Sequence, residues 1–181
     1  MINHKHRFVF IHVPKTGGTS LEMAFGYSER NRHIKHLNAQ KYSELLGNIF
    51  LEYKKIPIIR NPWDRALSFY FYRKLENRLN DKINSFTDWV YYIKNKKGIF
   101  EGIYDYLLND DSICCDIFLN FCNLEEDFNN FCKSQNISLK LPHINKTKHK
   151  HYTEYYNDET KQIVAEKYAK DIEYFNFEFG E

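Results

Sequence analysis

A short apolar run leads directly into a glycine-containing loop near the start of the chain, over residues 8–21 (FVFIHVPKTGGTSL). Its aromatic and β-branched residues predict a strand over residues 7–13, and Thr19, Ser20 and Glu22 open a short helix predicted over residues 19–25. A loop whose glycines leave backbone N–H groups accessible, followed by a helix, is typical of a phosphate-binding site. This segment most constrains the fold, because it predicts an α/β protein with an anion-binding loop at the end of a strand.

The order of residues in this loop differs from the nucleoside-triphosphate loop G-x-x-x-x-G-K-[ST]. In that motif the lysine and the hydroxyl residue follow the glycines, whereas Lys15 and Thr16 precede Gly17 and Gly18 here. The match to an ATPase is therefore poor, and the loop is predicted to hold a different phosphate ligand. For this segment taken alone, a simple Gly-Gly turn beside a surface lysine is the alternative.

A second strand-to-helix turn follows at residues 55–73 (KIPIIRNPWDRALSFYFYR). Residues 55–59 are typical of a short buried strand, and Pro62 suits the first turn of the helix after it. Between the two strands, Asn38 is predicted to cap a helix that runs to about Leu46. This order predicts a parallel strand pair with a right-handed crossover, and two such turns side by side form the crevice in which α/β sheets bind ligands.

The remaining elements are predicted from apolar periodicity and from breaks in it. At 181 residues and without a repeat or a linker-like segment, the chain is predicted to form one domain over residues 1–181. The expected fold is a P-loop-like central parallel sheet flanked by helices. Further helices are expected over residues 85–97, 124–135 and 158–174, a strand over residues 115–119, and loops over residues 28–38 and 140–152.

Composition restricts the partners and the location of the chain. The formal net charge of +2 is too small for a general nucleic-acid binder, although residues 140–151 concentrate lysine and histidine and favour a small polyanionic ligand. No run approaches the roughly 20 apolar residues of a membrane span, and the first residues lack the apolar core of a secretory signal. The chain is therefore predicted to be cytoplasmic. The four cysteines are predicted to be small core residues in a reducing compartment: Cys114, Cys115, Cys122 and Cys132.

Three separated segments together resemble the sulfotransferases that use 3′-phosphoadenosine 5′-phosphosulfate (PAPS). The resemblance covers nearly the whole chain and is to the carbohydrate-modifying group, which includes heparan sulfate 2-O-sulfotransferase and short bacterial relatives. It implies transfer of a sulfuryl group from PAPS to a hydroxyl acceptor, with a carbohydrate expected, adenosine 3′,5′-bisphosphate (PAP) as product and no metal. The segments are residues 10–20 (FIHVPKTGGTS), 59–70 (IRNPWDRALSFY) and 141–152 (LPHINKTKHKHY).

The resemblance also assigns roles to residues that match the family motifs. It implies that Lys15 reaches the bridging oxygen, whose negative charge grows as the S–O bond breaks. The second segment places Arg60 and Ser68 at the 3′-phosphate, and the third places Thr147 and Lys150 over the nucleotide. The first loop is implied to hold the 5′-phosphosulfate through Lys15, Thr16, Gly17, Gly18, Thr19 and Ser20.

A general base must take the proton of the acceptor hydroxyl. The short bacterial relatives carry a His-x-x-Ala element between the two nucleotide motifs, and His36-Leu-Asn-Ala39 matches it. An imidazole that titrates near neutrality suits this role, so His36 is the predicted base and His33 the reserve. The alternative for His36 is a polar surface histidine. His12, on the apolar strand, is assigned to packing.

Some residues depart from this interpretation, and two other functions stay open. Asn120 and Cys122 stand where the family pattern predicts charged residues, and Arg65 and Arg73 are assigned to helix-surface charge. The first alternative function is a magnesium-dependent P-loop kinase that phosphorylates a small molecule with ATP. The second is a non-catalytic module that binds polyanions through residues 140–151. The sequence does not identify the acceptor or the oligomeric state.

Overall fold

The computed structural model describes residues 1–27, 34–142 and 149–181, and the chain divides into two compact units. The chain passes from unit 1 to unit 2 between Arg60 and Asn61, inside the second predicted motif. The prediction of one domain over residues 1–181 stays a prediction. Unit 1 comprises Met1–Arg60 and Ile103–Ile144, and unit 2 comprises Asn61–Gly102 and Asn145–Glu181.

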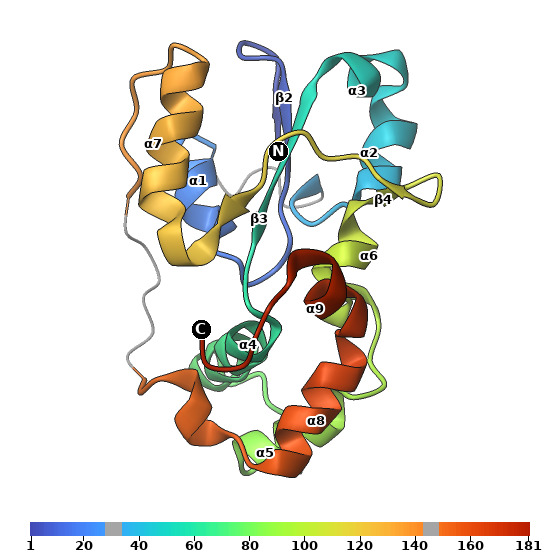
Figure 1. Cartoon of the computed structure of the whole chain (residues 1–181), viewed down its shortest axis with the longest axis vertical. Helices are drawn as coiled ribbons and strands as arrows, with labels where there is room; N and C mark the ends of the chain where they lie inside the picture. The colour runs from blue at the N-terminus through green and yellow to red at the C-terminus, as the bar shows by residue number, and fades with distance from the viewer. Residues whose placement is uncertain (28–33, 143–148) are drawn as a thin grey trace. The chain divides into compact units, whose positions relative to one another are not determined.

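Unit 1 is built on a four-stranded sheet in the order β1-β2-β3-β6 (Figure 1). β2 and β3 are parallel, β3 and β6 are parallel, and β1 runs antiparallel to β2. The predicted α/β fold with a mostly parallel central sheet is therefore confirmed. The strands are β1 (Ile2–Asn3), β2 (Phe8–Ile11), β3 (Lys54–Ile59) and β6 (Leu119–Asn120).

Helices lie on both sides of this sheet. Figure 1 shows α1 and α7 on one side of the strands and α2 and α3 on the other. Side chains alternate along a strand, so Phe8 and Phe10 share a face, and they pack there in one apolar cluster with Phe128 of α7. The helices of unit 1 are α1 (Gly18–Ala24), α2 (Ala39–Leu46), α3 (Asn48–Glu52), α6 (Ile103–Leu107) and α7 (Leu124–Ser134).

Local sequence signals explain where α2 begins. The side chain of Asn38 accepts a hydrogen bond from the backbone N–H of Lys41 at 3.0 Å, as the predicted cap requires. The helix ends at Leu46 because Gly47 has a positive φ of 54°, a conformation that glycine adopts most easily. The Asn38 cap thus fixes the carboxyl end of the loop that precedes α2, and this loop carries His36.

A strand was predicted over residues 115–119, but the observed strand, β6, is shorter and begins only at Leu119. The side chain of Asp116 accepts from the backbone N–H of Lys55, and the backbone N–H of Asp116 donates to the carbonyl of Lys55. A carboxylate thus takes the place of a backbone acceptor, and regular pairing begins only at Leu119. Before it, β4 (Leu108–Asn109) and β5 (Ser112–Ile113) form a hairpin that the sequence did not predict.

Unit 2 is helical in its described part. Asn61 caps α4 by accepting from the backbone N–H of Trp63 at 3.1 Å, and Pro62 occupies the first turn, as predicted. The single helix predicted over residues 158–174 is two helices, and the break coincides with Tyr168, whose buried hydroxyl donates to the carbonyl of Phe100. The helices are α4 (Pro62–Leu75), α5 (Phe86–Ile93), α8 (Asp158–Lys167) and α9 (Ala169–Phe175), with short 3-10 turns η2 (Gly98–Phe100) and η4 (Tyr152–Tyr155).

Arg65 is not a surface charge, which corrects the sequence prediction. It is 1% exposed, and its Nη1 donates to the carbonyl of Glu101 at 2.9 Å. Its guanidinium also lies 5.5 Å from the ring centroid of Phe69 and 5.7 Å from that of Tyr168. The helical periodicity of α4 did not reveal this, because the elements packed around a helix decide how many of its faces are buried.

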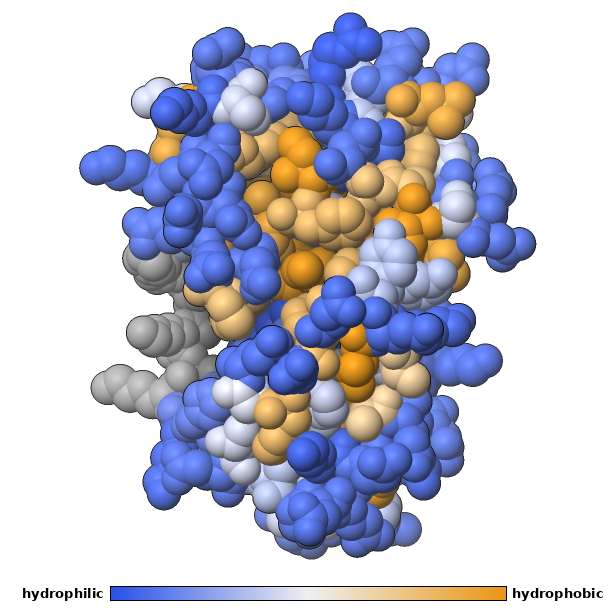
Figure 2. All heavy atoms as spheres, viewed as in Figure 1, coloured by the Kyte–Doolittle hydropathy of each residue, from blue (hydrophilic) through white to orange (hydrophobic). Residues whose placement is uncertain are grey.

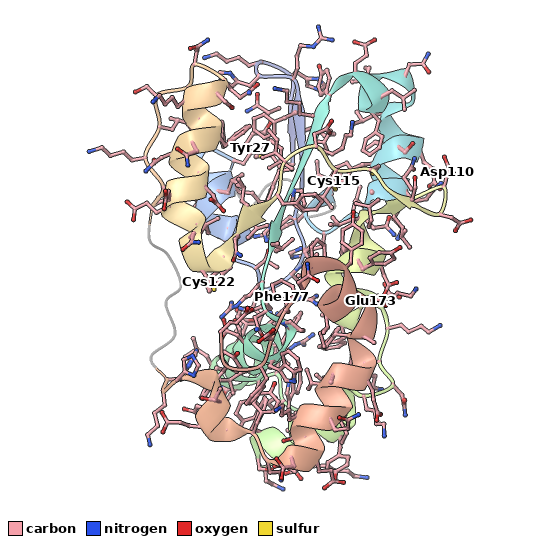
Figure 3. The ribbon with its side chains drawn as sticks, viewed as in Figure 1. Tyr27, Asp110, Cys115, Cys122, Glu173 and Phe177 are labelled. Atoms are coloured by element: carbon pink, nitrogen blue, oxygen red, sulfur yellow. The ribbon has the colours of Figure 1, made fainter. Side chains whose placement is uncertain are left out.

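The four cysteines carry free thiols, but only Cys132 lies in the core. Cys122 is exposed and Cys115 is half-buried. Figure 3 shows Cys122 near the start of α7 and Cys115 in the segment before β6. The core assignment is therefore wrong for three of the four.

Figure 2 shows apolar residues gathered on the face of unit 1 over the strands, among hydrophilic residues that cover most of the rest of this view. Of the helices in the described ranges, none combines the length and the apolar character needed to cross a bilayer. The cytoplasmic location stays a prediction.

Candidate active site

The predicted phosphate-binding loop joins β2 to α1 and has a backbone shape suited to an anion. Lys15 and Gly17 have positive φ angles of 68° and 88°, and Thr16 between them does not. Positive φ angles at such closely spaced residues are typical of backbone nests, in which successive N–H groups face one anion. Thr16 is buried and its hydroxyl donates to the carbonyl of Val13 at 2.9 Å, so its side chain stabilises the loop.

Both glycines of the loop are required by their surroundings. Gly17 has a positive φ, and a Cβ there would lie 3.1 Å from the ring of Phe121. A Cβ at Gly18 would lie only 2.4 Å from Cδ2 and 2.5 Å from Nε2 of His12. The ring of His12 thus packs directly against the backbone where α1 begins, and any side chain at position 18 would displace it.

Arg60 contacts the loop from the carboxyl end of β3. Its Nη1 donates to the carbonyl oxygen of Lys15 at 2.8 Å. Its guanidinium carbon lies 3.8 Å from the ring centroid of Phe121, a close cation–π contact. The structure therefore brings Lys15, Gly17 and Arg60 together in unit 1, and Phe121 is a contact of Arg60 that the sequence analysis did not single out.

Phe121 lies in the segment that departs from the family pattern. It follows β6, the strand next to β3, so it reaches the same edge of the sheet as Arg60. The sequence does place an aromatic residue shortly after a predicted strand. This pattern could not predict the contact with Arg60, because the sequence did not show that β6 pairs with β3.

His36 lies beside His12 and has the tautomer that a base needs. Its Nδ1 is 2.9 Å from the backbone carbonyl oxygen of His12. A carbonyl only accepts, so Nδ1 carries the proton and Nε2 keeps its lone pair. His36 is exposed at the surface, and the partial desolvation of its ring lowers its pKa below the ordinary value, which favours the neutral form at pH 7.

Glu22 of α1 is a buried carboxylate that the sequence assigned only to the start of the helix. Its Oε1 accepts from Nδ1 of His12 at 2.9 Å, and its Oε2 lies 3.5 Å from Nζ of Lys35. Burial lowers the pKa of His12 to about 4, so its ring is neutral near pH 7. Burial alone would raise the pKa of Glu22, but the His12 hydrogen bond and the charge of Lys35 outweigh it and keep the carboxylate ionised.

The other predicted site residues are placed as follows. Ser20 is buried in the first turn of α1, with its N–H donating to the carbonyl of Gly17, and Thr19 is half-buried beside it. In unit 2, Ser68 is buried on α4, and Lys150 is exposed with its Nζ 3.0 Å from Oε2 of Glu154. Thr147 and His33 lie outside the described residues.

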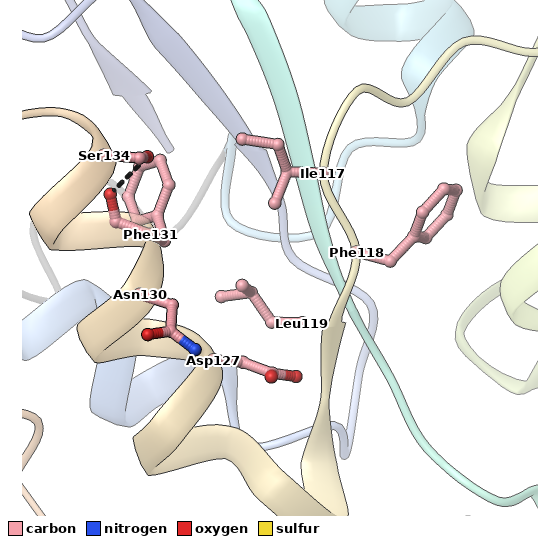
Figure 4. A pocket seen from close by; sticks show the side chains of 7 residues that line it. All are labelled: Ile117, Phe118, Leu119, Asp127, Asn130, Phe131 and Ser134. Carbon is pink, nitrogen blue, oxygen red and sulfur yellow. Dashed lines mark hydrogen bonds between the residues drawn. The ribbon is translucent and has the colours of Figure 1, made fainter.

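A hollow of about 280 Å³ lies between β6 and α7 (Figure 4). Asp127 is on its helical wall, and its carboxylate accepts the backbone N–H of Asn120 at 2.6 Å, which gives this group a structural role. None of the predicted site residues lines this hollow. Its lining is Ile117, Phe118, Leu119, Asp127, Asn130, Phe131 and Ser134.

Metal-ligating side chains do not gather in the described part of the chain. No three His, Cys, Asp or Glu residues there are grouped in a way that could hold a metal ion.

Comparisons with known proteins agree with the fold. The chain matches the model of the sulfotransferase family over residues 1–178. No curated protein sequence matches it. Among solved structures it is similar to mouse sulfotransferase SULT7A1 complexed with PAP, with a TM-score of 0.64 and 13% sequence identity over 95% of this chain and 86% of that chain. At this identity the structural likeness shows the fold.

The contact between Gly18 and His12 can be tested by adding one methyl group. We expect Gly18→Ala to lower the free energy of unfolding by about 1–3 kcal/mol, because the new Cβ overlaps a buried ring. Thr19→Ala, one position along the same helical turn, adds no atoms and serves as the matched control. Urea unfolding followed by circular dichroism measures both; equal stability of Gly18→Ala and the wild type would show that the His12 ring yields without cost.

Proposed function

Because the chain belongs to the sulfotransferase family, we propose that it transfers a sulfuryl group from PAPS to a hydroxyl of a carbohydrate, with His36 as general base. Family membership makes it a PAPS-dependent sulfotransferase, which decides against both the ATP-dependent kinase and the non-catalytic binding module. The observation that carries the proposal is the loop with positive φ angles at Lys15 and Gly17, with Arg60 bound to its backbone.

The loop fits the 5′-phosphosulfate of the donor. Its backbone has positive φ angles at Lys15 and Gly17, a Cβ at Gly18 would overlap the ring of His12, and one at Gly17 would crowd the ring of Phe121. Main chain therefore takes the place of side chains at this point. When bound, PAPS supplies an activated sulfuryl group and PAP as the leaving group. The solved neighbour is complexed with PAP, which supports this choice of donor. We assign the 5′-phosphosulfate to Lys15, Thr16, Gly17, Gly18, Thr19 and Ser20, with Thr16 acting through its backbone.

Two cations of unit 1 take different roles in this proposal. Lys15 stabilises negative charge that develops on the leaving oxygen, where a preorganised ammonium is most effective. Arg60 binds the 3′-phosphate, as the family motif implies, because a planar guanidinium with five donors suits phosphate oxygens and spends one donor on the Lys15 carbonyl. The same motif assigns Ser68 to the 3′-phosphate, and the third segment assigns Thr147 and Lys150 to the nucleotide.

His36 is proposed to remove the acceptor proton. Sulfuryl transfer resembles phosphoryl transfer in depending on positioning and charge stabilisation, so the proton acceptor must be neutral and oriented before reaction. The hydrogen bond from Nδ1 of His36 to the carbonyl of His12 supports both conditions, since it leaves Nε2 unprotonated. His33 remains the reserve base.

The carbohydrate acceptor rests on the likeness of the three sequence segments to carbohydrate-modifying sulfotransferases. Incubation with ³⁵S-labelled PAPS and a panel of oligosaccharides, phenols and simple alcohols tests it. We expect label on an oligosaccharide, and none with the Lys15→Ala variant. Label on phenols or alcohols alone would contradict the carbohydrate assignment and leave the sulfotransferase reaction in place.

The two phosphate assignments can be separated by calorimetry with PAP and adenosine 5′-monophosphate. Charge-assisted hydrogen bonds contribute roughly 1.5–3 kcal/mol, so we expect each alanine variant to weaken PAP binding by about 10- to 150-fold. Lys15→Ala should weaken both ligands, whereas Arg60→Ala should remove the preference for the ligand with a 3′-phosphate. Lys133→Ala, at an exposed lysine of α7, is the control. Unchanged affinity in both site variants would contradict the assignments.

The base can be tested by separating turnover from binding. We expect His36→Ala to lower kcat by about 10²–10⁴-fold while PAP affinity stays the same, because the ring is assigned to the acceptor proton and not to the nucleotide. In the wild type, the acid limb of kcat/KM should lie below the ordinary histidine pKa, since desolvation lowers the pKa of His36 and the base works only when unprotonated. Loss of turnover in His33→Ala, with full activity in His36→Ala, would move the role to the reserve residue.

A further inference from the structure

We propose that Glu22 is a positioning residue for His36, which it orients through two routes and whose positive charge it balances after proton transfer. This inference rests on the proposed function, because it takes His36 as the general base. Glu22 is on α1, directly after the phosphate-binding loop, and the inference therefore links the loop that holds the donor to the group that activates the acceptor.

The first route runs through His12. Nδ1 of His12 donates to Oε1 of Glu22 at 2.9 Å, which fixes the orientation of the His12 ring. The backbone carbonyl of the same residue accepts from Nδ1 of His36 at 2.9 Å, and the two rings meet edge to face with centroids 4.6 Å apart. A shift of His12 would therefore move both the hydrogen-bond partner and the packing surface of His36.

The second route runs through Lys35. Its Nζ lies 3.5 Å from Oε2 of Glu22, and it is the residue immediately before His36 in the chain. One oxygen of Glu22 thus contacts the side chain of Lys35, which precedes His36 in the chain. The other contacts His12, whose carbonyl accepts the hydrogen bond from His36. This arrangement uses both carboxylate oxygens, and a neutral side chain at position 22 cannot accept from His12 and attract the Lys35 ammonium in the same way.

Burial makes a purely structural role a poor explanation for this carboxylate. The Glu22 side chain is 11% exposed, and α1 buries its neighbour Leu21 in the apolar cluster of unit 1. An ionised carboxylate removed from water loses several kcal/mol of solvation, and replacing a buried ion pair with apolar residues is often neutral or stabilising. A charge retained at this position is better explained by a group nearby that gains a positive charge.

His36 is that group. In the proposed step the proton of the acceptor hydroxyl ends on Nε2 of His36, while Nδ1–H stays bonded to the His12 carbonyl, so the ring gains one positive charge. The groups that face His36 from the surrounding elements have different effects on this charge. Desolvation opposes it most, Glu22 stabilises it, and Lys35 opposes it. Burial lowers the pKa of the Met1 amino group to about 5, so that group is neutral near pH 7. His12 is neutral, and the Tyr42 hydroxyl, which donates to the carbonyl of Ile34, keeps its proton at every pH at which the reaction is assayed.

Because Glu22 and Lys35 carry opposite charges, removing each of them should shift the acid limb of kcat/KM in opposite directions. Glu22→Gln keeps the shape and an oxygen that accepts from His12, but removes the negative charge that favours imidazolium. Its acid limb of kcat/KM should move to lower pH, and kcat on the plateau should fall about tenfold because the base is weaker. Lys35→Met removes the positive charge and should move the same limb to higher pH. Glu22→Asp keeps the charge and should keep the limb close to its wild-type position.

Two measurements separate this effect from a loss of structure. PAP affinity should be unchanged in Glu22→Gln and Lys35→Met, and NMR titration of His36 should show its pKa lowered in the first variant and raised in the second. Should Glu22→Gln fail to fold, Glu22→Asp tests the role of the carboxylate, because the proposal expects its acid limb and the pKa of His36 to stay close to their wild-type positions. If the pKa of His36 shifts in the same direction in Glu22→Gln and Lys35→Met, or does not shift in Glu22→Gln although turnover depends on His36, the proposed role of Glu22 is wrong. Full activity of His36→Ala overturns the base assignment instead, so the two failures are distinct.

Discussion

The candidate site depends on the contacts of one residue, His12. Its ring packs against the backbone of Gly18, its Nδ1 donates to Glu22, and its carbonyl accepts from His36. Burial keeps the ring neutral, so one uncharged residue satisfies three requirements without adding a second buried positive charge. A strand residue that the sequence assigned to packing therefore connects the phosphate-binding loop, the helix after it and the proposed base.

Arg60 fixes the other side of the same loop. Its bond to the Lys15 carbonyl stabilises a backbone conformation in which Lys15, a residue with a side chain, has a positive φ of 68°. Such a conformation costs free energy and persists where neighbours overdetermine it, often at functional sites. The cation–π contact with Phe121 orients the guanidinium that makes this bond. These contacts hold the loop in one shape, and a loop held in its binding shape spends less binding energy on ordering.

The sequence predicted the parts of the fold that local signals determine. Apolar runs gave β2 and β3, Asn38 and Pro62 marked helix starts, and the order of Lys15 and the glycines distinguished the loop from a triphosphate site. It did not predict features set by tertiary burial. Whether Arg65 is exposed depends on which elements cover α4, and whether Glu22 meets His12 depends on how α1 turns against β2. Phe121 reaches Arg60 only because β6 pairs with β3, and no short segment contains that information.

The second family motif spans the boundary between the two compact units. By its contacts Arg60 belongs to unit 1, where it bonds Lys15 and packs on Phe121, whereas Ser68 lies on a helix of unit 2. A motif that is continuous in sequence therefore contributes to two separately packed parts. The contacts that orient the proposed base and shape the phosphosulfate loop, by contrast, all join residues of unit 1: His12, Lys15, Gly18, Glu22, Lys35, His36, Arg60 and Phe121. The contacts that carry the proposed proton transfer to His36 thus lie within the described part of unit 1, and variants there should act on it through local packing.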